Sequence, residues 1–183
     1  MKQCIYGCLM ILMLFGTVAV AQETNDMAKG KSAIAAEFMA NLADVEKKLV
    51  GLAEATPAEK YAWRPAKGVR STGEVFAHLA GANYFVLSFA GVKPPPLDRD
   101  YEKKITDKAK IVEMMKASFA HVRKAAMEAS DADLEKKTKM FGQDTNCRNV
   151  YLVIVTHAHE HLGQSIAYAR MNGVTPPWSE GGQ

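Results

Sequence analysis

Cysteine is scarce in this 183-residue chain, and its three cysteines are unevenly placed. Cys4 and Cys8 lie within the first ten residues, and Cys147 is the only cysteine in the rest of the sequence. A lone cysteine cannot form an internal disulfide, so residues 22–183 do not form a disulfide-stapled scaffold. We interpret Cys147 as a structural residue and not as a catalytic nucleophile.

An excess of charge of one sign is also absent. The chain carries 23 Lys and Arg residues against 20 Asp and Glu residues, which gives a formal net charge of +3. Aromatic residues make up 8% of the sequence, and no basic stripe contains interleaved aromatics. This composition does not favour nucleic acid as a partner.

Strand patterns are the third absence. No segment alternates apolar and polar residues between hairpin turns, and no internal repeat is present. The chain is nevertheless 48% hydrophobic and long enough to bury a core as one globular domain. We therefore predict an all-α fold.

The first 21 residues differ from the rest of the chain. Lys2 is their only charged residue, residues 5–20 are almost wholly apolar, and Ala19-Val20-Ala21 has the pattern of a cleavage site. This pattern predicts a signal peptide cleaved after Ala21, which leaves a secreted or periplasmic domain of residues 22–183. An uncleaved anchor is the alternative, but the apolar run is shorter than the ~20 residues of a spanning helix. No stable membrane anchor is then expected, and the net charge falls from +3 to +2.

Apolar residues recur at helical spacing in four long segments, which predicts a four-helix bundle. The predicted helices cover residues 26–55, 71–90, 106–129 and 150–170. Ser71-Thr72-Gly73-Glu74 has the pattern of a capping box, and so has Thr56-Pro57-Ala58-Glu59 before a short turn. Another short turn is expected from Ser130, and residues 136–146 are expected to form a polar loop.

Two histidines stand out on the last predicted helix. His157 and His161 are four residues apart, so they lie on one face about 6 Å apart along the helix axis and could bind one metal ion. His159 must face away from them. The alternative is a solvated or hydrogen-bonded pair without a metal, but the pair continues the apolar line of Val150 and Ile154, where an unpartnered polar ring is costly.

A metal site built on this pair needs a further ligand. The zincin motif H-E-x-x-H is excluded, because Gly163 occupies the position of its second histidine. His78 is the only histidine between residues 22 and 120, and it lies beside the apolar face of the second helix. Alone it would be read as a satisfied core residue, but in a bundle it could join the pair, because such sites use side chains from facing helices. His121 falls outside the apolar stripe of its helix and is expected on the surface.

Two segments resemble the DinB-like (DinB/YfiT) superfamily. One is Trp63-Arg64-Pro65-Ala66 with residues 71–79, and the other is His157-x-x-x-His161-x-Gly163-Gln164 with the residues up to Pro177. The resemblance implies a four-helix bundle, often as a homodimer, in which His78, His157 and His161 hold a divalent metal. The sequence departs from the family pattern at Leu162, where a basic residue is common, and in carrying His159 within the motif.

Three imidazoles suit zinc, our first expectation, with nickel or iron as alternatives. Glu74 and Gln164 are the expected acceptors for the outer ring nitrogens of the ligands. Tyr168 and Arg170 are expected on the bundle surface, with a position at the mouth of the site as the alternative. The leading hypothesis is an exported enzyme that hydrolyses a small-molecule substrate with water activated at the metal. A thiol-dependent S-transferase or isomerase, as in cytosolic members of the family, is one alternative. A non-catalytic metal-binding module is the other.

Overall fold

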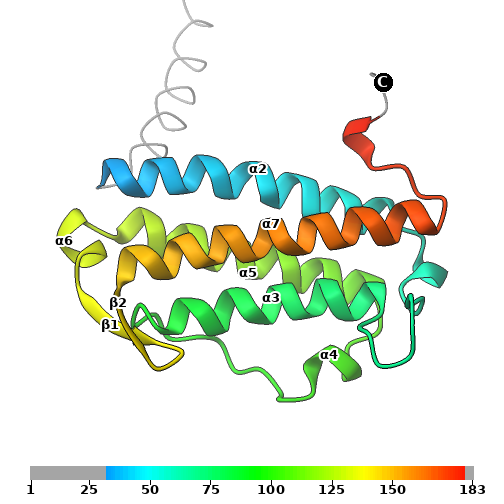
Figure 1. The fold of residues 1–183 in the computed structure, drawn as a ribbon, viewed down its shortest axis with the longest axis horizontal. Helices are drawn as coiled ribbons and strands as arrows, with labels where there is room; N and C mark the ends of the chain where they lie inside the picture. The colour runs from blue at the N-terminus through cyan, green and yellow to red at the C-terminus, as the bar shows by residue number, and fades with distance from the viewer. Residues whose placement is uncertain (1–31, 180–183) are drawn as a thin grey trace, which may run out of the picture.

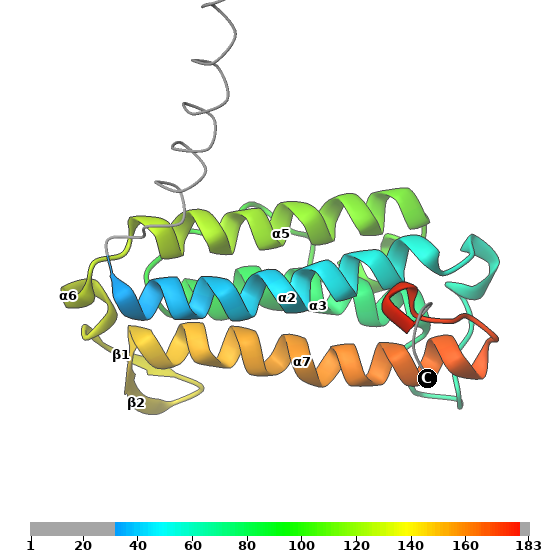
Figure 2. The same cartoon turned by 90° about the horizontal axis from the view of Figure 1, so that it is seen from above.

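Four long helices lie side by side in the computed structural model, which describes residues 32–179 (Figure 1). They are α2 (Ala33–Ala55), α3 (Thr72–Ser88), α5 (Lys108–Glu128) and α7 (Cys147–Met171). Helices α2 and α3 each contact both α5 and α7, so α2 and α3 lie diagonally opposite each other. The view from above shows α5 and α7 on either side of this pair (Figure 2). The predicted helical bundle is confirmed.

The predicted signal peptide, residues 1–21, lies outside the described residues, and so does the start of the helix predicted from residue 26. Within residues 32–179, no helix combines the length and the apolar character that crossing a membrane requires.

The core of the bundle is formed by apolar side chains from all four helices. Burial of these side chains is the main favourable contribution to folding. Apolar residues at helical spacing on α2 and α5 face this core, and most of them are buried. The central fully buried residues are Leu42, Val45, Leu49, Leu52, Phe76, Leu79, Ile111, Met115, Phe119, Val122, Val150 and Ile154.

Side-chain caps fix where α3 and α7 begin. Ser71 Oγ accepts a hydrogen bond from Glu74 N, and the Glu74 carboxylate accepts one from Ser71 N at 2.6 Å, so the predicted capping box forms. Asn146 Oδ1 accepts from Asn149 N at 3.0 Å, so α7 begins three residues before the predicted start. Its end at Met171 is followed by Gly173 with a φ of 70°, a left-handed conformation that glycine adopts readily after a helix.

The capping box predicted at Thr56 does not form. Thr56 ends α2 instead, because its hydroxyl donates a hydrogen bond back to the Leu52 carbonyl at 2.7 Å. The next turn is the short 3₁₀ helix η1 (Ala58–Lys60), which follows Pro57 and has no side-chain cap.

The prediction of a polar loop at residues 136–146 is wrong, because this segment is a β-hairpin. Strands β1 (Lys137–Met140) and β2 (Gln143–Asn146) pair antiparallel, with Met140 opposite Gln143. The turn residues Phe141 and Gly142 both have positive φ values, 52° and 82°, as a two-residue type I′ turn requires. Thr138 Oγ1 donates a hydrogen bond to the Phe89 carbonyl at 2.6 Å and ties the hairpin to the end of α3.

Three further short helices lie in the connections and near the C-terminal end. Helix α6 (Asp131–Leu134) is the short turn predicted from Ser130, and the structure adds a capping box on that residue; η2 (Pro177–Ser179) follows α7. Helix α4 (Tyr101–Lys104) was not predicted, and it lies beside α3 in the connection to α5 (Figure 1).

The expectation of a surface position for His121 is also wrong. Its ring is half-buried and lies edge-on to Tyr84 with centroids 5.4 Å apart. Its Nε2 atom is buried and has no hydrogen-bond partner among the described residues.

Candidate metal centre

Three histidines from two neighbouring helices converge in the bundle. His78 comes from α3, and His157 and His161 come from successive turns of α7. One nitrogen from each ring can be chosen so that all three lie within 4.8 Å of one another. The His78 ring centroid is 5.4 Å from that of His157 and 5.0 Å from that of His161. Segments separated by nearly eighty residues therefore meet at one point, as the histidine pattern predicts.

His159 does not take part in this cluster. Its side chain is exposed, and its Nδ1 atom is 2.9 Å from the Val155 carbonyl oxygen of the preceding turn. The predicted orientation away from the pair is confirmed, and His159 provides a natural control for the two neighbouring histidines.

A hydrogen-bond chain along α7 orients His161. Its Nδ1 atom lies 2.8 Å from Gln164 Oε1, and Gln164 Nε2 donates to Tyr168 Oη at 3.1 Å. An amide oxygen only accepts, so Nδ1 of His161 carries the proton. Gln164 thus occupies the position expected for an acceptor behind a ligand.

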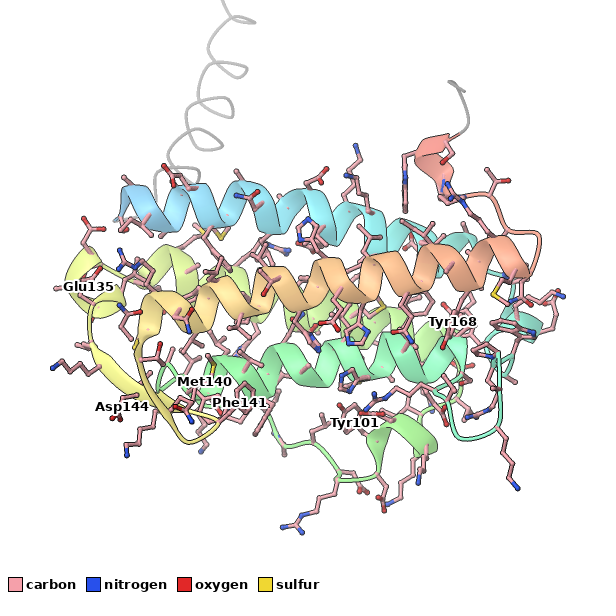
Figure 3. The ribbon with its side chains drawn as sticks, viewed as in Figure 1. Tyr101, Glu135, Met140, Phe141, Asp144 and Tyr168 are labelled. Atoms are coloured by element: carbon pink, nitrogen blue, oxygen red, sulfur yellow. The ribbon has the colours of Figure 1, made fainter. Side chains whose placement is uncertain are left out.

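Tyr168 is not the surface residue that we expected. It is 7% exposed, and its ring lies edge-on to Trp63 with centroids 5.3 Å apart. Figure 3 shows Tyr168 on the C-terminal half of α7. Burial follows from this contact with the loop between α2 and α3, which the helical pattern of α7 alone does not predict. Arg170 is exposed, as expected.

Glu102 contacts His78, and sequence reasoning missed it. Its Oε1 atom lies 2.8 Å from His78 Nδ1, and its Oε2 atom accepts a hydrogen bond from Arg70 Nε at 2.7 Å. Glu102 lies on the unpredicted helix α4, twenty-four residues after His78, so no helical spacing could indicate the contact.

Glu74 does not contact a histidine as we expected. Its carboxylate closes the capping box of α3 and forms an ion pair with Arg64 at 3.1 Å. Burial alone would raise the pKa of Glu74, but its hydrogen bonds to Ser71 and Arg64 hold it below its usual value. The carboxylate is therefore committed to the start of α3, about one turn before His78.

The surroundings of His157 and His161 favour the neutral form of both rings. Burial, and then the proximity of His161 and His78, lowers the pKa of His157 to about 4. Burial also lowers the pKa of His161, although the hydrogen bond to Gln164 opposes this effect. Neutral imidazole is the form that binds metal ions.

The arrangement of the ring nitrogens fits a divalent cation. His78 and His161 each direct Nδ1 at an acceptor, so their Nε2 atoms carry free lone pairs when the rings are neutral. His157 Nε2 is 3.1 Å from His161 Nε2, which without a metal allows one hydrogen bond between them. A cation would be able to accept both lone pairs together with that of His78. Ring nitrogens backed by acceptors in this way are usual for metal-binding histidines.

The centre is separate from the apolar cavity of about 530 Å³ between the first turns of α2 and α7. That cavity is lined by residues such as Phe38, Tyr151 and Leu152, and by none of the three histidines.

A helical bundle with a cluster of three histidines shared by α3 and α7 defines the protein class: a DinB-type bundle with a candidate metal centre. Comparison with protein families assigns the chain to a family directly. The family model described as DinB superfamily matches residues 41–165, and the chain belongs to that superfamily. This confirms the resemblance inferred from the sequence.

Solved structures of DinB-like proteins share the fold. A DinB-like protein from Bacillus cereus ATCC 10987 has a TM-score of 0.70 and 22% identity, with 76% of this chain and 93% of that chain covered. The DinB-like protein YjoA from Bacillus subtilis has a TM-score of 0.62 and 17% identity, with the same coverage. No curated protein matches the sequence.

Proposed function

We propose that the protein is an exported metal-dependent enzyme of the hydrolase type, with His78, His157 and His161 as the protein ligands of a divalent ion. The observation that carries this proposal is the convergence of three ring nitrogens, two of them from rings held by acceptors on the opposite nitrogen. Zinc is the first candidate for the ion, and nickel or iron would suit the same donors.

A coordination position would remain open for water or substrate, because three histidines do not complete the coordination of these ions. A divalent ion bound there would act as a Lewis acid, polarising a substrate oxygen and making water easier to deprotonate. The chain itself supplies three imidazole ligands, two fixed ring orientations and partial exclusion of water, since each of the three histidines is half-buried.

Residues 1–21 support export, because they combine one positive charge, an apolar run and an A-x-A sequence. Export favours hydrolysis over a thiol-dependent transfer, since water is present in every compartment and the low-molecular-weight thiol cofactors are cytosolic. A small-molecule substrate without stable nucleic-acid or membrane contacts is consistent with the near-balanced charge.

The proposal is tested with residues 22–183 loaded with zinc and 4-nitrophenyl acetate as the probe substrate. We expect ester hydrolysis that requires the metal and falls to the metal-free rate in His161→Ala. His159→Ala is the matched control, because it removes an exposed histidine from the same helix and should keep the activity.

Two other results would favour the alternatives. Chloride release from 1-chloro-2,4-dinitrobenzene that requires both the metal and an added thiol, without ester hydrolysis, would indicate a transferase. Stoichiometric metal binding without turnover in either assay would indicate a metal-binding module.

A further inference from the structure

We propose that the short helix α4 supports the metal centre. Glu102 is a positioning residue for His78, and the contact between Tyr101 and Gly81 fixes the position of Glu102. This inference rests on the proposed function in one respect, namely that His78 is a metal ligand.

The Glu102 carboxylate is fully engaged by groups around His78. Its Oε1 atom accepts hydrogen bonds from His78 Nδ1 at 2.8 Å, Tyr101 Oη at 3.3 Å and Arg70 Nη2 at 3.3 Å. Its Oε2 atom accepts from Arg70 Nε at 2.7 Å. An ionised carboxylate can only accept, so it selects the ring form of His78 with the proton on Nδ1 and the lone pair on Nε2. The His78 ring lies beside the rings of His157 and His161, with centroids 5.4 and 5.0 Å away.

The setting of Glu102 suits an ionised carboxylate, because the Arg70 guanidinium donates a hydrogen bond to each of its two oxygens. The carboxylate is therefore available as an acceptor for His78 Nδ1.

The ion pair with Arg70 cannot by itself hold α4 in place. The Arg70 side chain is 43% exposed and that of Glu102 is 25% exposed, and ion pairs this accessible to solvent contribute little to stability. Helix α4 has four residues, far below the length at which a helix is stable alone. Its position must come from packing.

Packing of Tyr101 against Gly81 supplies that position. A Cβ atom at Gly81 would lie 2.1 Å from Tyr101 Oη and 2.2 Å from its Cζ, so the tyrosine ring rests directly on the backbone of α3. Glycine in the interior of a helix is destabilising relative to alanine, and this close approach explains its presence. Figure 3 shows Tyr101 between α4 and α3.

Contacts thus link Gly81 to the metal centre through Tyr101 and Glu102, two adjacent residues of α4. Gly81 lies three residues after His78 on the same helix, and Glu102 follows Tyr101 directly. A side chain at position 81 would displace the ring of Tyr101, and with it the carboxylate that orients His78.

The test uses residues 22–183 and two readouts: zinc affinity by competition with a chelating dye, and the ¹⁵N NMR signals of the His78 ring in the metal-free protein. We expect Glu102→Ala to weaken zinc binding about 10–100-fold and to shift His78 away from the Nδ1-protonated form. Glu102→Gln should lose less, because its amide oxygen can still accept from Nδ1. Gly81→Ala should weaken binding in the same direction as Glu102→Ala.

Matched controls separate these effects from general damage. Lys103→Ala changes an exposed residue of the same short helix, and Gly51→Ala places a methyl group where nothing lies within 4 Å. Both should keep the wild-type affinity. If Gly81→Ala fails to fold, Tyr101→Ala tests the same contact without adding a clash, and it too should weaken zinc binding.

The outcomes are distinct. Glu102→Ala with wild-type zinc affinity and an unchanged His78 ring form would overturn the role of Glu102. Wild-type affinity in folded Gly81→Ala and in Tyr101→Ala would overturn the role of α4 packing. A wild-type protein that binds no zinc would contradict the proposed function, and the ring form of His78 in Glu102→Ala would still decide whether Glu102 positions it.

Discussion

At the scale of single residues, the centre depends on which nitrogen of each ring is free. Gln164 Oε1 and Glu102 Oε1 each lie 2.8 Å from the Nδ1 atom of a histidine, and they belong to different elements. The acceptor for the Nδ1–H group is thus a neutral amide within α7 in one case and a carboxylate on the short helix α4 in the other. A neutral acceptor and a charged one should affect metal binding to different extents.

Replacing Gln164 with alanine removes the acceptor behind His161 and breaks the link to Tyr168. We expect zinc affinity to fall about tenfold, at the lower end of the effect of such partners, because the lost acceptor is uncharged. Chelator competition measures the change. Gln143→Ala, which alters an exposed glutamine of β2, should bind as the wild type does, and equal affinities in all three proteins would contradict the assignment.

Acid should destabilise the metal-free fold by protonating His157 of α7. The pKa of His157 is lowered to about 4 in the folded protein, against about 6.5 for an unperturbed histidine. The unfolded chain therefore binds more protons between these values, so this contribution to stability is intact above pH 6.5 and is lost as the pH falls toward 4.

Thermal unfolding of the metal-free protein between pH 7.5 and pH 5 measures this effect. The wild type should lose more of its melting temperature across this range than His157→Gln, which has no ring to protonate. Parallel curves for the two proteins would show that His157 is not held neutral by the fold.

The candidate site could be predicted only in part, for reasons that differ between residues. His157, His161 and Gln164 are related by helical spacing, so one pattern places all three on neighbouring turns. His78 could be predicted only as the one histidine between residues 22 and 120 that could complete the pair, and the family resemblance supported that choice, because a lone histidine on an apolar face carries no signal of its partners. Glu102 could not be predicted, since its contact depends on how the connection after α3 folds back.

At the scale of elements, helix ends and tight turns decide the geometry around the site. The long helices follow from apolar periodicity and caps, such as the Ser71 box that begins α3. The hairpin of residues 137–146 escaped prediction because Phe141 occupies a positive-φ turn position that asparagine, aspartate or glycine usually takes. The capping box predicted at Thr56 did not form for a related reason. The Thr56 hydroxyl can accept from a backbone N–H later in the chain or donate to a carbonyl of the preceding turn, and the sequence alone does not decide between the two.

Gly163 lies inside α7, and no neighbouring element approaches it closely. A Cβ atom at this position would meet nothing within 4 Å. We predict that Gly163→Ala stabilises the protein by about 0.5–1 kcal/mol, because alanine is the better helix former. Urea unfolding measures the change, and a destabilised variant would indicate a contact that the isolated chain does not make.

At the scale of the whole molecule, a metal at this centre would join α3 to α7. Binding to the folded state alone stabilises it by about 2.7 kcal/mol when free ligand is at 100 times the Kd. For a domain of this size we expect zinc to raise the melting temperature by roughly 5–10 °C. Scanning calorimetry with and without a chelator measures the rise, His161→Ala should not show it, and an equal rise in both proteins would place the zinc elsewhere.

The most direct test of the metal centre is the metal content of residues 22–183, purified without an immobilised-nickel column and measured by elemental analysis. We predict about one zinc, nickel or iron ion per wild-type chain and none in His78→Ala, with both proteins folded. Wild-type protein that stays free of these metals after incubation with each of them, or His78→Ala that retains a full equivalent, would contradict the account.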